Sequence, residues 1–121
     1  TYGAQIIISE FTQSKLKGIY ALRELDRIVV KGKTEPVSIF EVLDFHDDDT
    51  FPARMDVVGH FLEGLNHYRS TNFDDAIKSF SAALAANDSD VPSQLYIDRC
   101  NLFKQTPPPA GWSGEWVMTE K

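Results

Sequence analysis

The sequence predicts an α+β fold in which a small β-α-β-β unit precedes an α-helical hairpin and a third helix. Short β-branched or alternating apolar segments dominate up to Leu43, whereas from Ala53 onward the apolar residues recur at helical spacing. The charge is divided as well. Six basic residues balance six acidic ones up to His46, and six basic residues face twelve acidic ones from Asp47, so the net charge of −6 lies wholly in the second part. These observations indicate two structural units.

The first unit, residues 1–43, is predicted to open with a strand and a short helix. The β-branched apolar run Gln5–Ser9 is typical of a buried strand. The Ser9 side chain can accept a hydrogen bond from the first turn of the helix. Glu10 then suits the positive end of the helix dipole, and Gly18 provides the stop.

The remainder of this unit is predicted to be a β-hairpin. Its first strand, Ile19–Val30, loses its alternation between Leu22 and Leu25, which indicates a bulge or a bend. The segment KGKTEP turns the chain, because Gly32 can adopt a positive φ and the proline ends the turn. The second strand, Val37–Leu43, returns antiparallel. A unit of about 43 residues lies near the limit of independent folding, so we expect additional strands from a longer polypeptide or from a second copy.

Residues 44–52 are predicted to be a linker, and residues 53–106 a three-helix unit. Pro52 suits the opening turn of the first helix, Asn72 can cap the second, and the third follows Pro92 and ends before the TPPP run. The apolar side chains of each helix fall on one face. They are Met55, Val58, Phe61, Leu62, Leu65 and Tyr68, then Phe73, Ala76, Ile77, Phe80, Ala83 and Leu84, then Leu95, Tyr96, Leu102 and Phe103.

The first two of these helices resemble a single tetratricopeptide unit. The matching residues are Gly64, Ala76, Phe80 and Ala83. The sequence departs from that repeat at His60, which stands at the usual tryptophan position, and at Asp88, which replaces the closing proline. Asn87 is expected to stop the second helix in a left-handed conformation. Because one repeat cannot bury its apolar face alone, the third helix or a partner must complete the core.

A second resemblance covers the first unit. The segments YGAQIIIS and RELDRIVVKGKTEPVSIFEVL resemble the end of class III nucleotide cyclase catalytic domains. Residues 107–121 form a Pro/Trp tail, and a helical extension with a W-x-x-x-W tail is similar to the ends of some bacterial multidomain adenylate cyclases. The resemblance implies the C-terminal part of an enzyme that converts ATP to cyclic AMP and pyrophosphate in signal transduction. The helical extension would then be a regulatory or interaction module.

The resemblance also implies one substrate-binding residue. Lys31 would reach the polyphosphate of ATP across a head-to-tail dimer, as a compact ammonium on a long stem. Lys33 receives no such role, and the residues alone are explained equally by two lysines that keep an exposed hairpin soluble. No catalytic residue and no metal ligand is assigned, because Glu24 and Asp26 do not match the family's metal-binding aspartates and no Asn–Arg pair precedes the YG segment. We therefore expect no cyclisation by this chain alone, whereas the parent enzyme would use Mg²⁺ or Mn²⁺.

Three other groups of residues have the chemistry of possible sites. The run Asp47–Asp49 lacks the spacing of a metal-binding loop and is more typical of a solvated segment. His60, Glu63 and His67 share a helical face at ligand-like spacing, although an exposed set of this kind is more often only solvated. Cys100 is flanked by apolar helix positions, which favours a packed thiol over a nucleophile.

Composition limits the class of partner and compartment. A hydrophobic fraction of 42% excludes an intrinsically disordered chain. The sequence has no basic stripe of the kind that binds nucleic acid, so a nucleic-acid partner is not expected. No apolar run reaches the roughly 20 residues of a membrane span. The single cysteine favours a reducing cytoplasm. The start at Thr1 indicates a piece of a longer polypeptide. The resemblance implies that other segments of this polypeptide could anchor it in the inner membrane. We expect self-association as a homodimer and a possible protein partner for the helices. The alternative function is a tetratricopeptide-type adapter without an enzymatic role.

Overall fold

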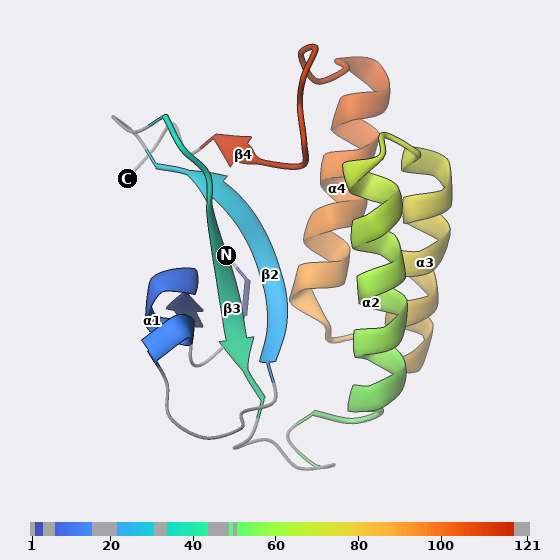
Figure 1. Cartoon of the computed structure of the whole chain (residues 1–121). Coiled ribbons are helices and arrows are strands. Elements are labelled where there is room, and N and C mark those ends of the chain that lie inside the picture. The colour runs from blue at the N-terminus through green and yellow to red at the C-terminus, as the bar shows by residue number, and fades with distance from the viewer. Residues whose placement is uncertain are drawn as a thin grey trace. The chain divides into compact units, whose positions relative to one another are not determined.

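The computed structural model describes residues 2–3, 7–15, 22–30, 34–43, 49 and 51–117. The chain divides into two compact units (Figure 1). The sheet unit comprises Ala4–His46 together with Glu115–Lys121, and the helical unit comprises Asp47–Gly114 together with Thr1–Gly3. A four-stranded mixed sheet and a helical hairpin with a third helix confirm the predicted α+β class.

The sheet has the strand order β1-β3-β2-β4. β1 (Ile7–Ser9) and β2 (Leu22–Val29) both pair antiparallel with β3 (Val37–Val42). The predicted β-α-β-β order is therefore confirmed. β4 (Trp116–Val117) pairs parallel with β2, within residues 107–121, for which the sequence predicts only a Pro/Trp tail.

A bulge interrupts the β2–β3 ladder where the sequence alternation slips. Glu24 pairs with Phe40, but the next partner, Ile39, pairs with Asp26, so Leu25 is the extra residue. Leu25 is fully buried, and the Asp26 carboxylate accepts a hydrogen bond from the Arg27 amide at 2.8 Å. The structure confirms the predicted bulge.

The short helix α1 (Glu10–Lys15) is fixed at its first turn. The Ser9 hydroxyl accepts a hydrogen bond from the Thr12 amide at 3.3 Å, which confirms the predicted cap. The Glu10 carboxylate accepts a hydrogen bond from the Ser38 amide at 2.9 Å and so ties the start of the helix to β3. Gly18, the predicted stop, lies outside the described residues.

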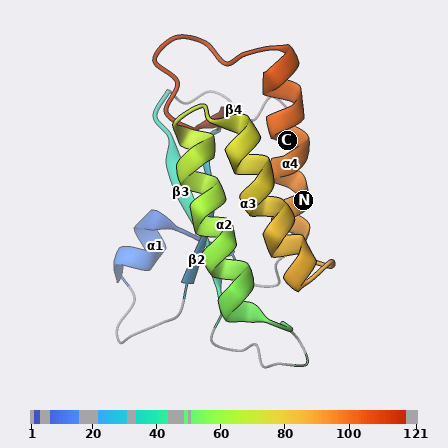
Figure 2. The ribbon, with the colours of Figure 1, turned by 90° about the vertical axis from the view of Figure 1, so that its right-hand side faces the viewer.

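The helical unit contains α2 (Arg54–Arg69), α3 (Phe73–Ala86) and α4 (Val91–Gln105). Figures 1 and 2 show α2 beside α3 and α3 beside α4. The three predicted helices are confirmed, with Pro92 inside the first turn of α4 rather than before it.

Three predicted end signals differ from the structure. Pro52 lies before the helix, because α2 begins after Ala53, which has a left-handed φ of 55°. Asn72 stands at the N-cap of α3, but its side chain makes no capping hydrogen bond. Asn87 ends α3 in an extended conformation with φ −152°. Its side chain donates to the Pro52 carbonyl at 3.3 Å and accepts from the Ser89 amide at 3.1 Å, so the residue turns the chain after α3 through an Asx-type contact and not through a left-handed stop.

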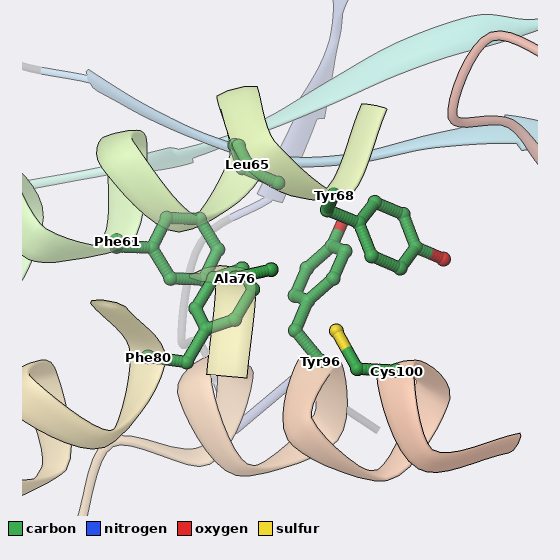
Figure 3. Packing of buried hydrophobic residues seen from close by; sticks show 7 residues of the cluster. All are labelled: Phe61, Leu65, Tyr68, Ala76, Phe80, Tyr96 and Cys100. Carbon is green, nitrogen blue, oxygen red and sulfur yellow. The ribbon is translucent and has the colours of Figure 1, made fainter. Parts of the chain in front are cut away.

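An aromatic core fills the space between the three helices (Figure 3). Phe80 stacks on Tyr96 at 5.1 Å between ring centroids, and Phe61 meets both rings edge-on at 5.5 Å. Tyr68 meets Tyr96 edge-on at 4.9 Å. The core thus closes with α4, as expected for a single repeat that needs a third helix. The buried cluster consists of Phe61, Leu65, Tyr68, Ala76, Phe80, Tyr96 and Cys100.

Candidate functional site

The β2–β3 hairpin carries the predicted substrate contact. Its strands pair from Leu22 with Val42 to Ile28 with Val37, so both run unbroken on either side of the bulge. Lys31 and Lys33 belong to the connection between these strands but lie outside the described residues. The assignment of Lys31 to a phosphate contact stays a prediction.

A buried ion pair ties the two hairpin strands together. The Arg23 guanidinium donates to one oxygen of Glu41, from Nη2 at 2.6 Å and from Nε at 3.0 Å. The two side chains are only 2% and 4% exposed. Charge-assisted hydrogen bonds of this kind are strong. The buried pair also fixes the register of β2 on β3, because a shift of one strand along the other would separate the two buried charges. Sequence reasoning missed this pair. Its signal was present, since pairing Leu22 with Val42 necessarily places Arg23 opposite Glu41.

An open pocket of about 440 Å³ lies between Phe11 of α1 and the residues on either side of the hairpin turn. Phe11, Val30 and Val37 supply its apolar surface, and Thr34 and Glu35 supply its polar groups. Such a volume suits a small ligand. The Thr34 hydroxyl and the Glu35 carboxylate could form hydrogen bonds to such a ligand.

The residues weighed as metal ligands do not form a cluster in the described ranges. Within residues 2–3, 7–15, 22–30, 34–43, 49 and 51–117, no group of three or more His, Cys, Asp or Glu side chains is placed to hold a metal ion. His60 Nδ1 lies 3.4 Å from the Glu63 carboxylate on the surface of α2. Asp47 and Asp48 lie outside the described residues.

Cys100 is part of the buried aromatic core (Figure 3). Burial raises the pKa of its thiol to about 12, because the thiolate would lose its hydration. A reactive cysteine needs a lowered pKa and solvent access. The prediction of a packed thiol is therefore confirmed.

The described chain contains no helix that combines the length and the apolar character needed to cross a membrane. The chain is thus a small two-unit module, with a paired β-hairpin in one unit and a three-helix aromatic core in the other.

Comparison with known proteins gives one distant relation. No family model and no solved structure matches the chain. The chain is 28% identical over 102 residues to the terminal-differentiation-specific adenylate cyclase of Dictyostelium discoideum. The aligned region covers 82% of this chain but only 5% of that much longer protein. The chain is thus distantly similar to a small part of an adenylate cyclase.

Proposed function

We propose that this chain is the C-terminal part of a class III adenylate cyclase, with Lys31 on the polyphosphate of ATP and the helices as a regulatory or interaction extension. The observation that carries the proposal is the similarity to the Dictyostelium adenylate cyclase. The aligned 102 residues are more than either unit holds, so the similarity extends over parts of both units and is not limited to the hairpin.

The described part of the hairpin supplies the rigidity that a phosphate contact requires. The Arg23–Glu41 pair locks the strands to one another, and the hydrogen bond from Ser38 to Glu10 ties β3 to α1. Ordered flanking strands would lower only the backbone part of the entropy that Lys31 loses on a phosphate, because the lysine side chain itself is flexible. Cyclisation itself would depend on metal-binding and transition-state residues that match no position in this sequence.

The test compares Lys31→Ala with Lys33→Ala in the longer polypeptide that contains these residues. Loss of one charge-assisted contact is worth about 1.5–3 kcal/mol, so Lys31→Ala should lower kcat/KM for ATP roughly ten- to hundred-fold. Lys33→Ala removes the same charge from the same connection and should change kcat/KM by less than about two-fold. Equal effects of the two substitutions would contradict the assignment.

A tetratricopeptide-type adapter is the second candidate. It is supported by the burial of Gly64, Ala76, Phe80 and Ala83, the four residues that match the repeat, within the helical unit. An adapter needs no nucleotide contact. A longer polypeptide that lacks cyclase activity, even with Mn²⁺ and ATP, would favour this function over the first.

A further inference from the structure

The pocket of the sheet unit is built from α1 and from both ends of the hairpin connection. Phe11 comes from α1, Val30 follows β2, and Val37 begins β3. Ile28 pairs with Val37 where the ladder ends. Because side chains alternate along an extended chain, Val30 and Glu35 fall on the same face as this pair. All of these residues belong to the sheet unit, so the site is defined within one unit.

A hydrogen bond holds the two apolar walls of the pocket opposite one another. The Glu10 carboxylate, one residue before Phe11, accepts from the amide of Ser38, one residue after Val37, at 2.9 Å. Figure 1 shows α1 beside β3, as this bond requires. The Ser9 hydroxyl fixes the first turn of α1 in addition. The pocket is therefore preformed, which lowers the ordering cost when a ligand binds.

The lining combines exposed apolar side chains with a carboxylate. Phe11 is 63% exposed and Val30 is 45% exposed. One exposed apolar side chain is ordinary, but two at the same concave surface fit the apolar lining of a small-molecule site. Among the lining residues that the structure describes, Glu35 carries the charge and Thr34 a hydroxyl. An aromatic wall beside a carboxylate complements a ring that carries a positive charge.

We propose that this pocket binds a small arylalkylamine, with the aromatic ring against Phe11 and the valines and the ammonium on the Glu35 carboxylate. The Thr34 hydroxyl accepts a second hydrogen bond from the ammonium. The volume of about 440 Å³ lies in the range of small-molecule sites. Lys31 and Lys33 precede Thr34 in the sequence and lie outside the described residues, so an anionic ligand is the competitor that the test must include.

The test titrates three compounds with the same indole ring into the whole chain, without nucleotide. Tryptamine ends in an ammonium, tryptophol in a hydroxyl and indolepropionate in a carboxylate. Amide NMR shifts of Phe11, Thr34 and Glu35 follow the binding. Tryptamine should bind with a Kd on the order of a millimolar or tighter, tryptophol roughly three- to tenfold more weakly, and indolepropionate more weakly still. Binding of indolepropionate as tight as that of tryptamine would overturn the proposal.

Two variants separate the contact with the charge from the contact with the ring. Glu35→Gln should weaken tryptamine binding roughly three- to tenfold and leave tryptophol within about two-fold, because only tryptamine uses the charge. Phe11→Ala should weaken both compounds roughly three- to tenfold, because it removes the wall that their common ring contacts. Since both side chains are exposed, neither substitution should unfold the sheet unit, and the amides of β2 and β3 verify this.

Glu24→Gln is the matched control. It makes the same change of charge on β2, six residues before Val30 and thus roughly 20 Å along the strand from the pocket. It should change tryptamine binding by less than about two-fold. If Glu35→Gln has no larger effect than Glu24→Gln, or weakens tryptophol as much as tryptamine, the ammonium does not sit on Glu35 and the proposal is wrong.

A second copy of the chain is the other occupant that the same spectra detect. Amide shifts of Phe11 and Thr34 would then follow the protein concentration in the absence of tryptamine, and tryptamine would produce no saturable shift. That result would assign the pocket to self-association and overturn the small-molecule site. Shifts that saturate with tryptamine at a fixed, low protein concentration support the site.

A regulatory consequence rests on the proposed function. The connection between Val30 and Thr34 carries Lys31, and a ligand that contacts both ends of this connection restricts its backbone before the phosphate binds. In the longer polypeptide, tryptamine should raise kcat/KM for ATP roughly two- to fivefold, and Glu35→Gln should abolish this rise. The amine site is tested by titration without nucleotide, and the phosphate contact by the comparison of Lys31 with Lys33. Failure of either proposal is therefore recognised without the other.

Discussion

The ring of Phe80 fills the space that a side chain on Gly64 would occupy. A Cβ on Gly64 would lie 2.6 Å from Cε1 of Phe80, well inside van der Waals contact. The ring has no room to retreat, because it stacks on Tyr96 and is fully buried. The absence of a side chain on α2 thus permits the close crossing with α3 on which the helical unit depends.

Gly64→Ala should therefore destabilise the helical unit. Overpacking at such a crossing costs about 1–3 kcal/mol, which the better helix propensity of alanine offsets by up to about 1 kcal/mol. Gly59→Ala is the matched control on the same helix, since a Cβ there meets no atom within 4 Å. It should raise the free energy of unfolding by about 0.5–1 kcal/mol. Urea unfolding followed by far-ultraviolet circular dichroism measures both, and a stabilised Gly64→Ala variant would contradict the packing argument.

The surface ion pair between Lys104 and Asp74 joins the end of α4 to the start of α3, with 2.5 Å between Nζ and Oδ1. The hydrogen bond and charge of Lys104 lower the pKa of the Asp74 carboxyl below its ordinary value of 3.8, with a smaller contribution from Lys78. Because folding lowers the pKa of Asp74, the pair stabilises the fold at pH values above the pKa that Asp74 has in the unfolded chain. That contribution is lost as the pH falls below about 3.8 through the folded pKa.

Lys104→Met should raise the pKa of Asp74 toward 3.8, and Lys78→Met should raise it less. An NMR titration of the Asp74 carboxyl carbon gives the pKa directly in each variant. The effect on stability should be small at neutral pH, because both side chains are largely exposed and solvent screens the pair. Equal shifts in the two variants would show that the direct contact with Lys104 does not set the pKa.

The buried Arg23–Glu41 pair predicts a different response in the sheet unit. Arg23→Met leaves the Glu41 carboxylate buried without the guanidinium and should destabilise the unit by about 3–5 kcal/mol. The double variant Arg23→Met, Glu41→Leu removes both charges and should recover most of this loss. Hydrogen exchange in β2 and β3 follows the sheet unit separately from the helices. No recovery in the double variant would mean that the two charges do not compensate one another.

Local patterns predicted most of the fold. The slip between Leu22 and Leu25 located the bulge, and helical spacing located the three helices, because both signals depend on residues close in the sequence. Features set by distant residues were missed. The conformation of Asn87 follows from its contact with Pro52, and β4 follows from a strand far from it in the chain. A two-residue strand after PPPAGWSGE has no periodicity of its own.

The candidate site was predicted less completely than the fold. The role of Lys31 came from a family resemblance, and the described residues do not include it. The pair Arg23–Glu41, which makes the hairpin rigid, could be found only by assigning a register to the two strands. The pocket beside Phe11 required the packing of α1 on the hairpin, which no periodicity reveals.

The last prediction is self-association through the open edge of the sheet. β1 stands at the end of the strand order opposite to β4, and its described residues pair on one side with β3. Ile7 in this strand is 42% exposed, and apolar edge strands readily add a strand from another chain. We expect the average mass of the chain to rise with concentration in analytical ultracentrifugation.

Two substitutions locate the contact. Ile7→Lys places a charge on the edge and should weaken association roughly tenfold or more, as charged edge residues do in natural sheets. Leu62→Lys is the control, because Leu62 is 45% exposed on the outside of α2. If Leu62→Lys weakens association and Ile7→Lys does not, the helices form the contact and the edge strand does not. A mass that stays monomeric at every concentration would show that the β1 edge does not recruit a second copy.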